Sequence, residues 1–178
     1  MKKIVVIGPE STGKSTLCEA LAKHFNTLCC PEFARQFLTR HGMNYTYDDL
    51  LTIAKGQVAL EEEFTHRVAN SHKDANAQML FIDTEMFVMK VWCEFVFGKC
   101  HSYILDEIAT RRYDLYLLTD TDMEWVRDDL REYPDVETRR ELYSIYRHIL
   151  ENQSTPWVNI SGDWQQRFEK AVDAVAAL

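Results

Sequence analysis

The sequence feature that most constrains this chain is a run near its start, GPESTGKS at residues 8–15. The run fits G-x-x-x-x-G-K-[ST], the pattern of a phosphate-binding loop. A short apolar, β-branched strand is expected before it, at Ile4–Ile7. After it, Leu17, Leu21 and Phe25 repeat at the spacing of an amphipathic helix. Strand, loop and helix in this order predict a nucleotide-binding site.

The residue types of the loop suit the phosphates of ATP. Backbone N–H groups and the positive end of the following helix can surround an anion, and Gly8 and Gly13 allow close approach of the backbone. We expect Lys14 to reach the β- and γ-phosphates and Ser15 to ligate Mg²⁺. The expected cofactors are therefore ATP and Mg²⁺, and the expected ATP-binding residues here are Gly8, Glu10, Ser11, Thr12, Gly13, Lys14, Ser15 and Thr16.

Apolar runs alternate with helical patterns along the whole chain. Further strands are expected at residues 28–30, 79–82, 115–118 and 157–160, and helices at about 32–42, 50–68, 102–110 and 137–151, with a last one after 163. One of Asp48 and Asp49 is expected to cap the long helix that starts at Leu50. This alternation predicts an α/β fold with a five-stranded parallel sheet, helices on both faces and one domain over residues 1–178.

One further helix carries an aromatic stripe. Phe87, Val91, Trp92 and Phe95 share one face of it, and Gly98 is placed to end it. A stripe of this kind is more typical of a protein core than of a ligand site, so we interpret it as core.

Composition narrows the classes of partner. The formal net charge is −8, which argues against nucleic acid because binding a phosphate backbone needs a basic face. No apolar run approaches the length of a membrane span, and the charged start leads into a strand rather than a signal peptide. Five cysteines without a C-x-x-C pair suggest reduced thiols in the cytoplasm. Cys93, Cys100 and His101 match no zinc spacing, so we expect buried thiols there.

Polar residues follow several strands, at the sheet edge where ligands of parallel α/β proteins bind. Asp83 closes a strand and is expected to hold Mg²⁺ beside Ser15, to act in catalysis, or to cap the next helix. Glu32 follows the second strand, where a carboxylate can bind acceptor hydroxyls or take a proton. Either Asp83 or Glu32 could be the general base. Arg35, one turn on, could pair with Glu32 or bind phosphate.

Two later segments could cover the nucleotide. Arg127 and Arg131 lie four residues apart, as on one face of a helix, within an expected lid at about residues 123–140. There they could neutralise charge on a transferred phosphoryl group, although a solvated helix remains the alternative. Asp163 and Arg167 follow the last strand and could bind ATP near its adenine, unless Asp163 only caps a helix.

The combined motifs resemble the small AAA-like ATPase/kinase family that includes the ribosylnicotinamide kinase domain of NadR proteins. The resemblance rests on residues 8–17, 31–35, 47–50, 56–57, 81–85, 124–131 and 162–167, in order along nearly the whole chain. It implies a nucleoside-kinase-like fold with a lid and an enzyme that transfers the γ-phosphate of ATP to the 5′-hydroxyl of nicotinamide riboside, giving NMN for NAD salvage. It also implies that Glu32, Gln57 and Glu85 line the acceptor pocket, with Asp83 in catalysis.

Two departures from the family pattern lie at the acceptor end. Pro31 stands where the family tends to have an aromatic residue, and the acidic motif ends in Glu85 rather than Asp. Tyr45, Tyr47 or Trp92 could stack on the acceptor instead. A kinase for another nucleoside or nucleotide therefore stays open, as does an ATP-binding regulatory module without an acceptor. A homodimer, the commonest symmetric assembly, also stays open.

Overall fold

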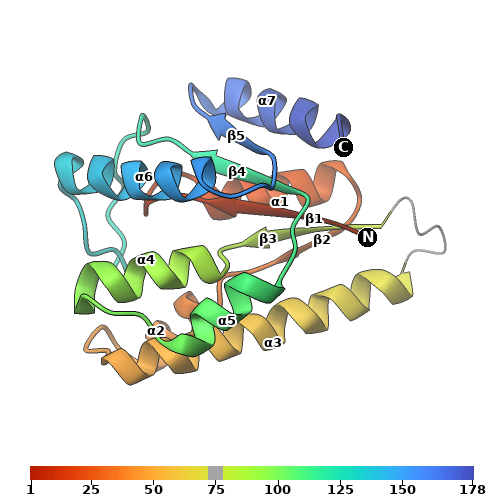
Figure 1. Cartoon of the computed structure of the whole chain (residues 1–178). Helices are drawn as coiled ribbons and strands as arrows, with labels where there is room; N and C mark the ends of the chain where they lie inside the picture. The colour runs from red at the N-terminus through yellow and green to blue at the C-terminus, as the bar shows by residue number, and fades with distance from the viewer. Residues whose placement is uncertain (72–77) are drawn as a thin grey trace.

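The computed structural model describes residues 1–71 and 78–178. Its five strands form one parallel sheet in the order β2-β3-β1-β4-β5 (Figure 1). They are β1 (Lys2–Ile7), β2 (Leu28–Cys30), β3 (Met79–Asp83), β4 (Leu115–Thr119) and β5 (Trp157–Ile160). The strand that precedes the phosphate-binding loop is central, with Val5 opposite Ile82 of β3 on one side and Tyr116 of β4 on the other.

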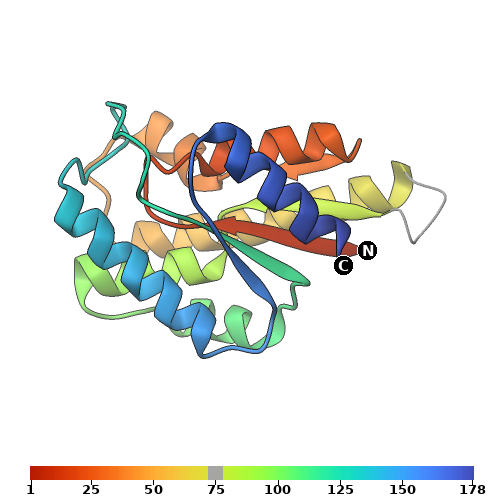
Figure 2. The same cartoon turned by 90° about the horizontal axis from the view of Figure 1, so that it is seen from above.

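Helices cover both faces of the sheet (Figures 1 and 2). α1 and α7 pack on one face, and α3, α4 and α6 pack on the other. The helices are α1 (Lys14–His24), α2 (Phe33–His41), α3 (Tyr47–Ser71), α4 (Met86–Phe97), α5 (Ser102–Thr110), α6 (Val136–Glu151) and α7 (Trp164–Ala176). The predicted α/β fold with a five-stranded parallel sheet is therefore confirmed.

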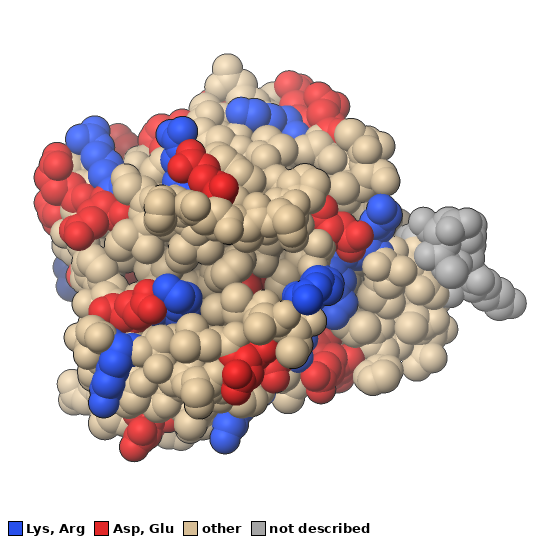
Figure 3. Space-filling model, in the orientation of Figure 1, with Lys and Arg blue, Asp and Glu red and all other residues tan. Residues whose placement is uncertain are grey.

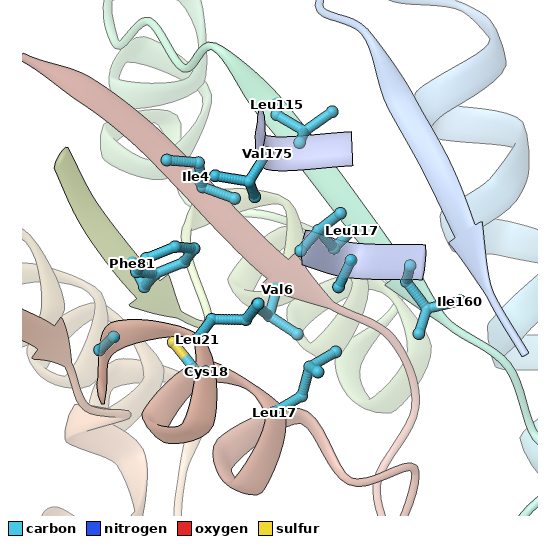
Figure 4. Close-up of a cluster of buried hydrophobic side chains, with 12 residues drawn as sticks. Ile4, Val6, Leu17, Cys18, Leu21, Phe81, Leu115, Leu117, Ile160 and Val175 are labelled. Atoms are coloured by element: carbon cyan, nitrogen blue, oxygen red, sulfur yellow. The ribbon is translucent and has the colours of Figure 1, made fainter. Parts of the chain in front are cut away.

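The apolar run of β1 is continuous because both of its faces are buried. Ile4 and Val6 point to the layer of α1 and α7, where they meet Leu17 and Leu21 (Figure 4). Val5 and Ile7 point to the opposite layer and are equally inaccessible to solvent. Burial of this strand anchors the start of the phosphate-binding loop in the middle of the core.

A third cluster of buried side chains joins α2 and α3 to α4 and α5. It contains Phe37, Leu50, Ile53 and Met89. Because α2 begins directly after Glu32, this packing fixes where that carboxylate stands relative to the sheet.

One predicted helix start is displaced, and the helix expected around Arg127 and Arg131 is absent from that part of the described chain. The long helix α3 begins at Tyr47 rather than Leu50, because Thr46 caps it: the Asp49 N–H donates to Thr46 Oγ1 (3.3 Å), and the Thr46 N–H donates to the Asp49 carboxylate (2.8 Å). Asp48 and Asp49 thus lie within its first turn. Residues 120–135, all of them described, contain no helix, so the expected helical pairing of Arg127 and Arg131 is wrong.

The two ends of the chain meet at the edge of the sheet opposite the phosphate-binding loop (Figure 2). The Lys2 ammonium donates to the backbone carbonyl of Leu178 (3.2 Å). On the face drawn in Figure 3, acidic and basic side chains of the described residues are interspersed, without a continuous basic patch. Among the helices that the structure describes, none is long and apolar enough to cross a membrane.

Candidate active site

The phosphate-binding loop is held by close contact with β4. Gly8 has a φ of 144°, and a Cβ there would lie 2.5 Å from Oγ1 and 2.7 Å from the carbonyl oxygen of Thr119. Only glycine fits this approach. The Thr12 hydroxyl bonds to the Pro9 carbonyl and to the Thr119 hydroxyl, both at 2.7 Å. The loop is therefore shaped before any ligand binds.

The other end of the loop opens onto α1. Gly13 stands before the helix in a left-handed conformation, and no side chain caps the first N–H groups. These N–H groups and the helix dipole provide a site for an anion. The Lys14 ammonium donates to the Pro9 carbonyl (2.8 Å), which keeps it beside the loop.

A cavity of about 790 Å³ opens in front of this loop, at the carboxyl ends of the strands. Its polar lining includes residues 8–16, Glu19, Glu32, Arg35 and Asp83. Its apolar and aromatic lining includes Leu60, Val88, Val91, Trp92, Phe95, Leu130, Tyr133, Leu142 and Tyr146. The cavity thus offers both charged side chains and aromatic surface to a ligand.

The aromatic stripe of α4 does not belong to the core alone. Val91, Trp92 and Phe95 pack in or against the hydrophobic clusters, as the core interpretation predicts, and they also line the cavity, which that interpretation did not include. The core side of α4 is formed by Met86, Met89, Val91 and Cys93. Of the three aromatic residues proposed to stack on an acceptor, Trp92 lines the cavity and donates its indole N–H to the Tyr45 hydroxyl (2.9 Å), whereas Tyr47 stacks on His101.

Two carboxylates, Asp83 and Glu32, belong to the polar lining of the cavity. Asp83 is buried at the end of β3, and its Oδ1 has no hydrogen-bond partner among the described residues. Burial raises the pKa of Asp83, and the Lys14 ammonium and the Ser15 hydroxyl oppose that rise. Burial also raises the pKa of Glu32, and the charge of Asp83 adds to the rise. Both groups are therefore better proton acceptors than exposed carboxylates.

The residues expected to hold Mg²⁺ fit that ion. Ser15 and Asp83 supply a hydroxyl and a carboxylate oxygen, the hard ligands that Mg²⁺ prefers. The unpartnered buried Oδ1 of Asp83 is a polar atom that an ion or its water could satisfy. Within the described residues, no group of three or more His, Cys, Asp or Glu side chains forms a metal cage. The set is that of an ion held partly by phosphate and water.

Three of the four arginines of the predicted site, Arg131, Arg127 and Arg35, have different surroundings. Arg131 lines the cavity and donates to Ser11 Oγ (3.2 Å) and to the Val126 carbonyl. Arg127 is exposed and lines a second, shallower hollow instead. Arg35 pairs with Asp128 (2.6 Å) rather than with Glu32.

Two residues implied by the family resemblance lie outside the cavity lining. Gln57 is buried; it accepts from the Phe33 N–H (2.7 Å) and donates to the Pro31 carbonyl (3.3 Å). It therefore holds the chain on either side of Glu32. Glu85 is buried at the start of α4 and accepts from the Phe87 N–H (2.8 Å), and burial raises its pKa to about 8. Both side chains lie behind the cavity wall rather than in it.

The residues after β5 start helix α7 and also contact the phosphate-binding loop. Asp163 accepts from the Gln166 N–H (2.9 Å) in a capping box. Arg167 is buried and donates to the carbonyls of Gly162, Thr12 and Asp120 and to the Asp122 carboxylate. Neither Asp163 nor Arg167 lines the cavity. The guanidinium instead supports the phosphate-binding loop from behind.

Sequence reasoning missed how residues 123–133 dock. The Glu10 carboxylate accepts from the backbone N–H groups of Glu132 (2.9 Å) and Tyr133 (2.5 Å), and Ser11 Oγ accepts from the Val126 N–H (2.9 Å). No local sequence pattern predicts these hydrogen-bonded pairs, because their members are more than 110 residues apart in the sequence. The cavity residues Glu19 and Tyr146 were also missed, since each reads as part of an ordinary amphipathic helix.

The comparisons with known proteins agree with this geometry. The model of the AAA_28 family, described as an AAA domain, matches residues 3–167. The chain belongs to the AAA_28 family. Its curated relatives include the trifunctional NAD biosynthesis/regulator protein NadR of Escherichia coli (strain K12), 29% identical over 98% of this chain, and that of Salmonella typhimurium, 28% identical over 98%. This AAA_28 chain spans only 42% of each of those proteins.

Two solved structures have folds similar to that of this AAA_28 chain. A NadR protein in complex with NR matches with a TM-score of 0.79 and 25% identity, over 99% of this chain and 49% of that one. Thymidylate kinase from Ehrlichia chaffeensis matches with a TM-score of 0.65 and 14% identity, over 98% of both chains, and shows the fold alone. The predicted resemblance to the NadR kinase domain is confirmed. The chain is a nucleoside-kinase-like P-loop protein.

Proposed function

We propose that this chain is an ATP-dependent kinase that phosphorylates the 5′-hydroxyl of nicotinamide riboside to give NMN, a step of NAD salvage in the cytoplasm. The observation that carries the proposal is a pair of carboxylates that line one cavity together with the phosphate-binding loop: Asp83, which is buried, and Glu32, which is half-buried. A phosphoryl acceptor needs a group that orients and deprotonates its hydroxyl, and these are the groups placed for that work. The relatives named NadR support the choice of acceptor.

The polar residues that line the cavity have distinct roles in this proposal. The N–H groups at the start of α1 and the Lys14 ammonium bind the phosphates of ATP, and Arg131 approaches them from the other side. Their positive charge stabilises the charge that spreads over the phosphoryl oxygens during transfer. Ser15 and Asp83 would hold Mg²⁺, which would withdraw charge from the phosphate oxygens of ATP. Asp83 or Glu32 accepts the proton of the attacking hydroxyl.

The apolar and aromatic lining of the cavity suits the nicotinamide ring of the acceptor. Trp92 and Phe95 offer aromatic surface for stacking, and Tyr133 and Tyr146 close the same wall. Nicotinamide riboside carries a cationic ring, and cations bind well to aromatic faces and to carboxylates. Trp92 thereby supplies the aromatic contact that Pro31 does not.

The test is a mass-spectrometric assay of the purified protein with Mg-ATP and a panel of ribosides that includes nicotinamide riboside. Phosphorylation of nicotinamide riboside alone is the expected result. Product from a different riboside would keep the kinase chemistry and refute the acceptor. If no riboside is phosphorylated while ATP still binds and is hydrolysed slowly without an acceptor, the kinase proposal is refuted and an ATP-dependent regulatory module takes its place.

A further inference from the structure

The segment from Met123 to Tyr133 lies against the phosphate-binding loop and lines one side of the cavity, and we call it the strap. It lies in the loop between β4 and α6. Leu130, Arg131, Glu132 and Tyr133 line the cavity from this side. The strap has no helix or strand of its own. Its position therefore depends on side chains that belong to other elements.

On the nucleotide side, the strap is held by two of the four variable positions of the phosphate-binding loop, Glu10 and Ser11. Glu10 accepts from two successive backbone N–H groups, those of Glu132 and Tyr133, and from the Trp125 indole N–H (3.5 Å). Ser11 Oγ accepts from the Val126 N–H and from Arg131. Five donors of the strap thus end on two side chains of the loop that binds phosphate.

On the acceptor side, the strap is held by two weaker contacts. Arg35 pairs with Asp128, and the Tyr45 hydroxyl donates to the Glu132 carboxylate (2.8 Å). The pair of Arg35 and Asp128 is more than half exposed on the arginine side, so it contributes little. The Glu10 carboxylate accepts charge-assisted bonds from backbone groups that cannot rotate away, which makes it the strongest single anchor.

We propose that Glu10 is a positioning residue that couples the phosphate-binding loop to closure of the strap, holding Arg131 over the phosphates and keeping water out during transfer. The role rests on the proposed kinase function. A carboxylate in this loop would repel phosphate if it faced the ligand, but here its charge is directed to the N–H groups of Glu132 and Tyr133. Loss of that charge frees the strap without removing a group that binds ATP.

The experiment compares Glu10→Gln with the parent and with Glu137→Gln, a matched control at an exposed carboxylate paired only with Arg140 among the described residues. Gln keeps one acceptor oxygen and turns an N–H toward the second strap donor. We therefore expect trypsin to cut the folded Glu10→Gln variant after Arg127 about tenfold faster than the parent. The control should be cut at the parental rate. Equal cleavage of variant and parent would overturn the proposal.

Kinetics separate positioning from a structural contact. We expect Glu10→Gln to lower kcat about tenfold and to raise the ratio of ATP hydrolysed to acceptor phosphorylated. Faster cleavage with unchanged kcat and unchanged ratio would overturn the positioning role. If the parent phosphorylates no acceptor, the proposed function fails, while cleavage and acceptor-free hydrolysis still decide whether Glu10 controls the strap.

Discussion

Replacing Gly56 by alanine is expected to destabilise this protein by about 1 kcal/mol, although the same change stabilises most helices by about that amount. Gly56 lies inside α3, against the first residue of α2. A Cβ at position 56 would lie 2.2 Å from Cε1 of Phe33 and 2.5 Å from Cδ1 and Cζ. Carbon atoms need about 3.5 Å or more, so the ring must move by more than about 1 Å.

Gly56→Ala has two opposite effects on the free energy of unfolding. Removing a glycine from a helix gains about 1 kcal/mol, and forcing a methyl group into an occupied site costs about 1–3 kcal/mol. Phe33 cannot shift freely, because its backbone N–H donates to Gln57 (2.7 Å) and its ring packs against the cluster below α2. The loss should therefore exceed the gain, and the displaced ring should also move the neighbouring Glu32 and lower kcat.

Urea unfolding measures the effect. With a slope of about 2 kcal/mol/M, the midpoint should fall by about 0.5 M at an unchanged slope. Adding Phe33→Leu to Gly56→Ala should recover most of the loss, because the smaller side chain leaves room for the methyl group, and the two changes should couple by about 1 kcal/mol. If Gly56→Ala alone stabilises the protein by about 1 kcal/mol, the contact does not hold Phe33 or Glu32, and the reasoning is refuted.

Three further predictions concern charged side chains. Asp83→Asn should lower kcat by about 10²–10⁴ while calorimetry still detects ATP binding; survival of turnover would pass the role of base to Glu32. Arg131→Met should lower kcat by about 10² or more, and Arg127→Met by no more than about threefold, in the mass-spectrometric assay of riboside phosphorylation; equal losses would contradict the different places of the two arginines. Burial raises the pKa of Glu85 to about 8, so folding takes up a proton and stability falls as pH rises from about 5 to 8. Glu85→Gln should match the parent in Tm near pH 5 and exceed it near pH 8, and an equal pH dependence in both would refute the assignment.

The strands and most helices could be predicted because their signals are local. A β-branched run such as that of β1 must be buried on both faces, and five such runs separated by helical patterns fit a parallel sheet. Gly98 ends α4 in a left-handed conformation with a φ of 66°, as its position in the sequence suggested. In these elements, local preference and tertiary packing agree.

The strap and the acceptor wall could not be predicted in the same way. Arg127 and Arg131 have helical spacing, but the N–H groups of the strap are taken by Glu10 and Ser11, which the chain brings close only after folding. Phe95 shows the same limit, because a helix face that is partly core and partly cavity has the pattern of a core face. Tertiary contacts decide both cases, and a single sequence does not reveal them.

The meeting of the two chain ends, Lys2 beside Leu178, has a practical consequence for protein engineering. Both ends lie at the edge of the sheet remote from the cavity (Figure 2), so an affinity tag or a second enzyme fused to either end would leave the mouth of the cavity clear. Ends this close also allow the described unit to be inserted as a whole into an exposed loop of a host protein, since entry and exit need almost the same point.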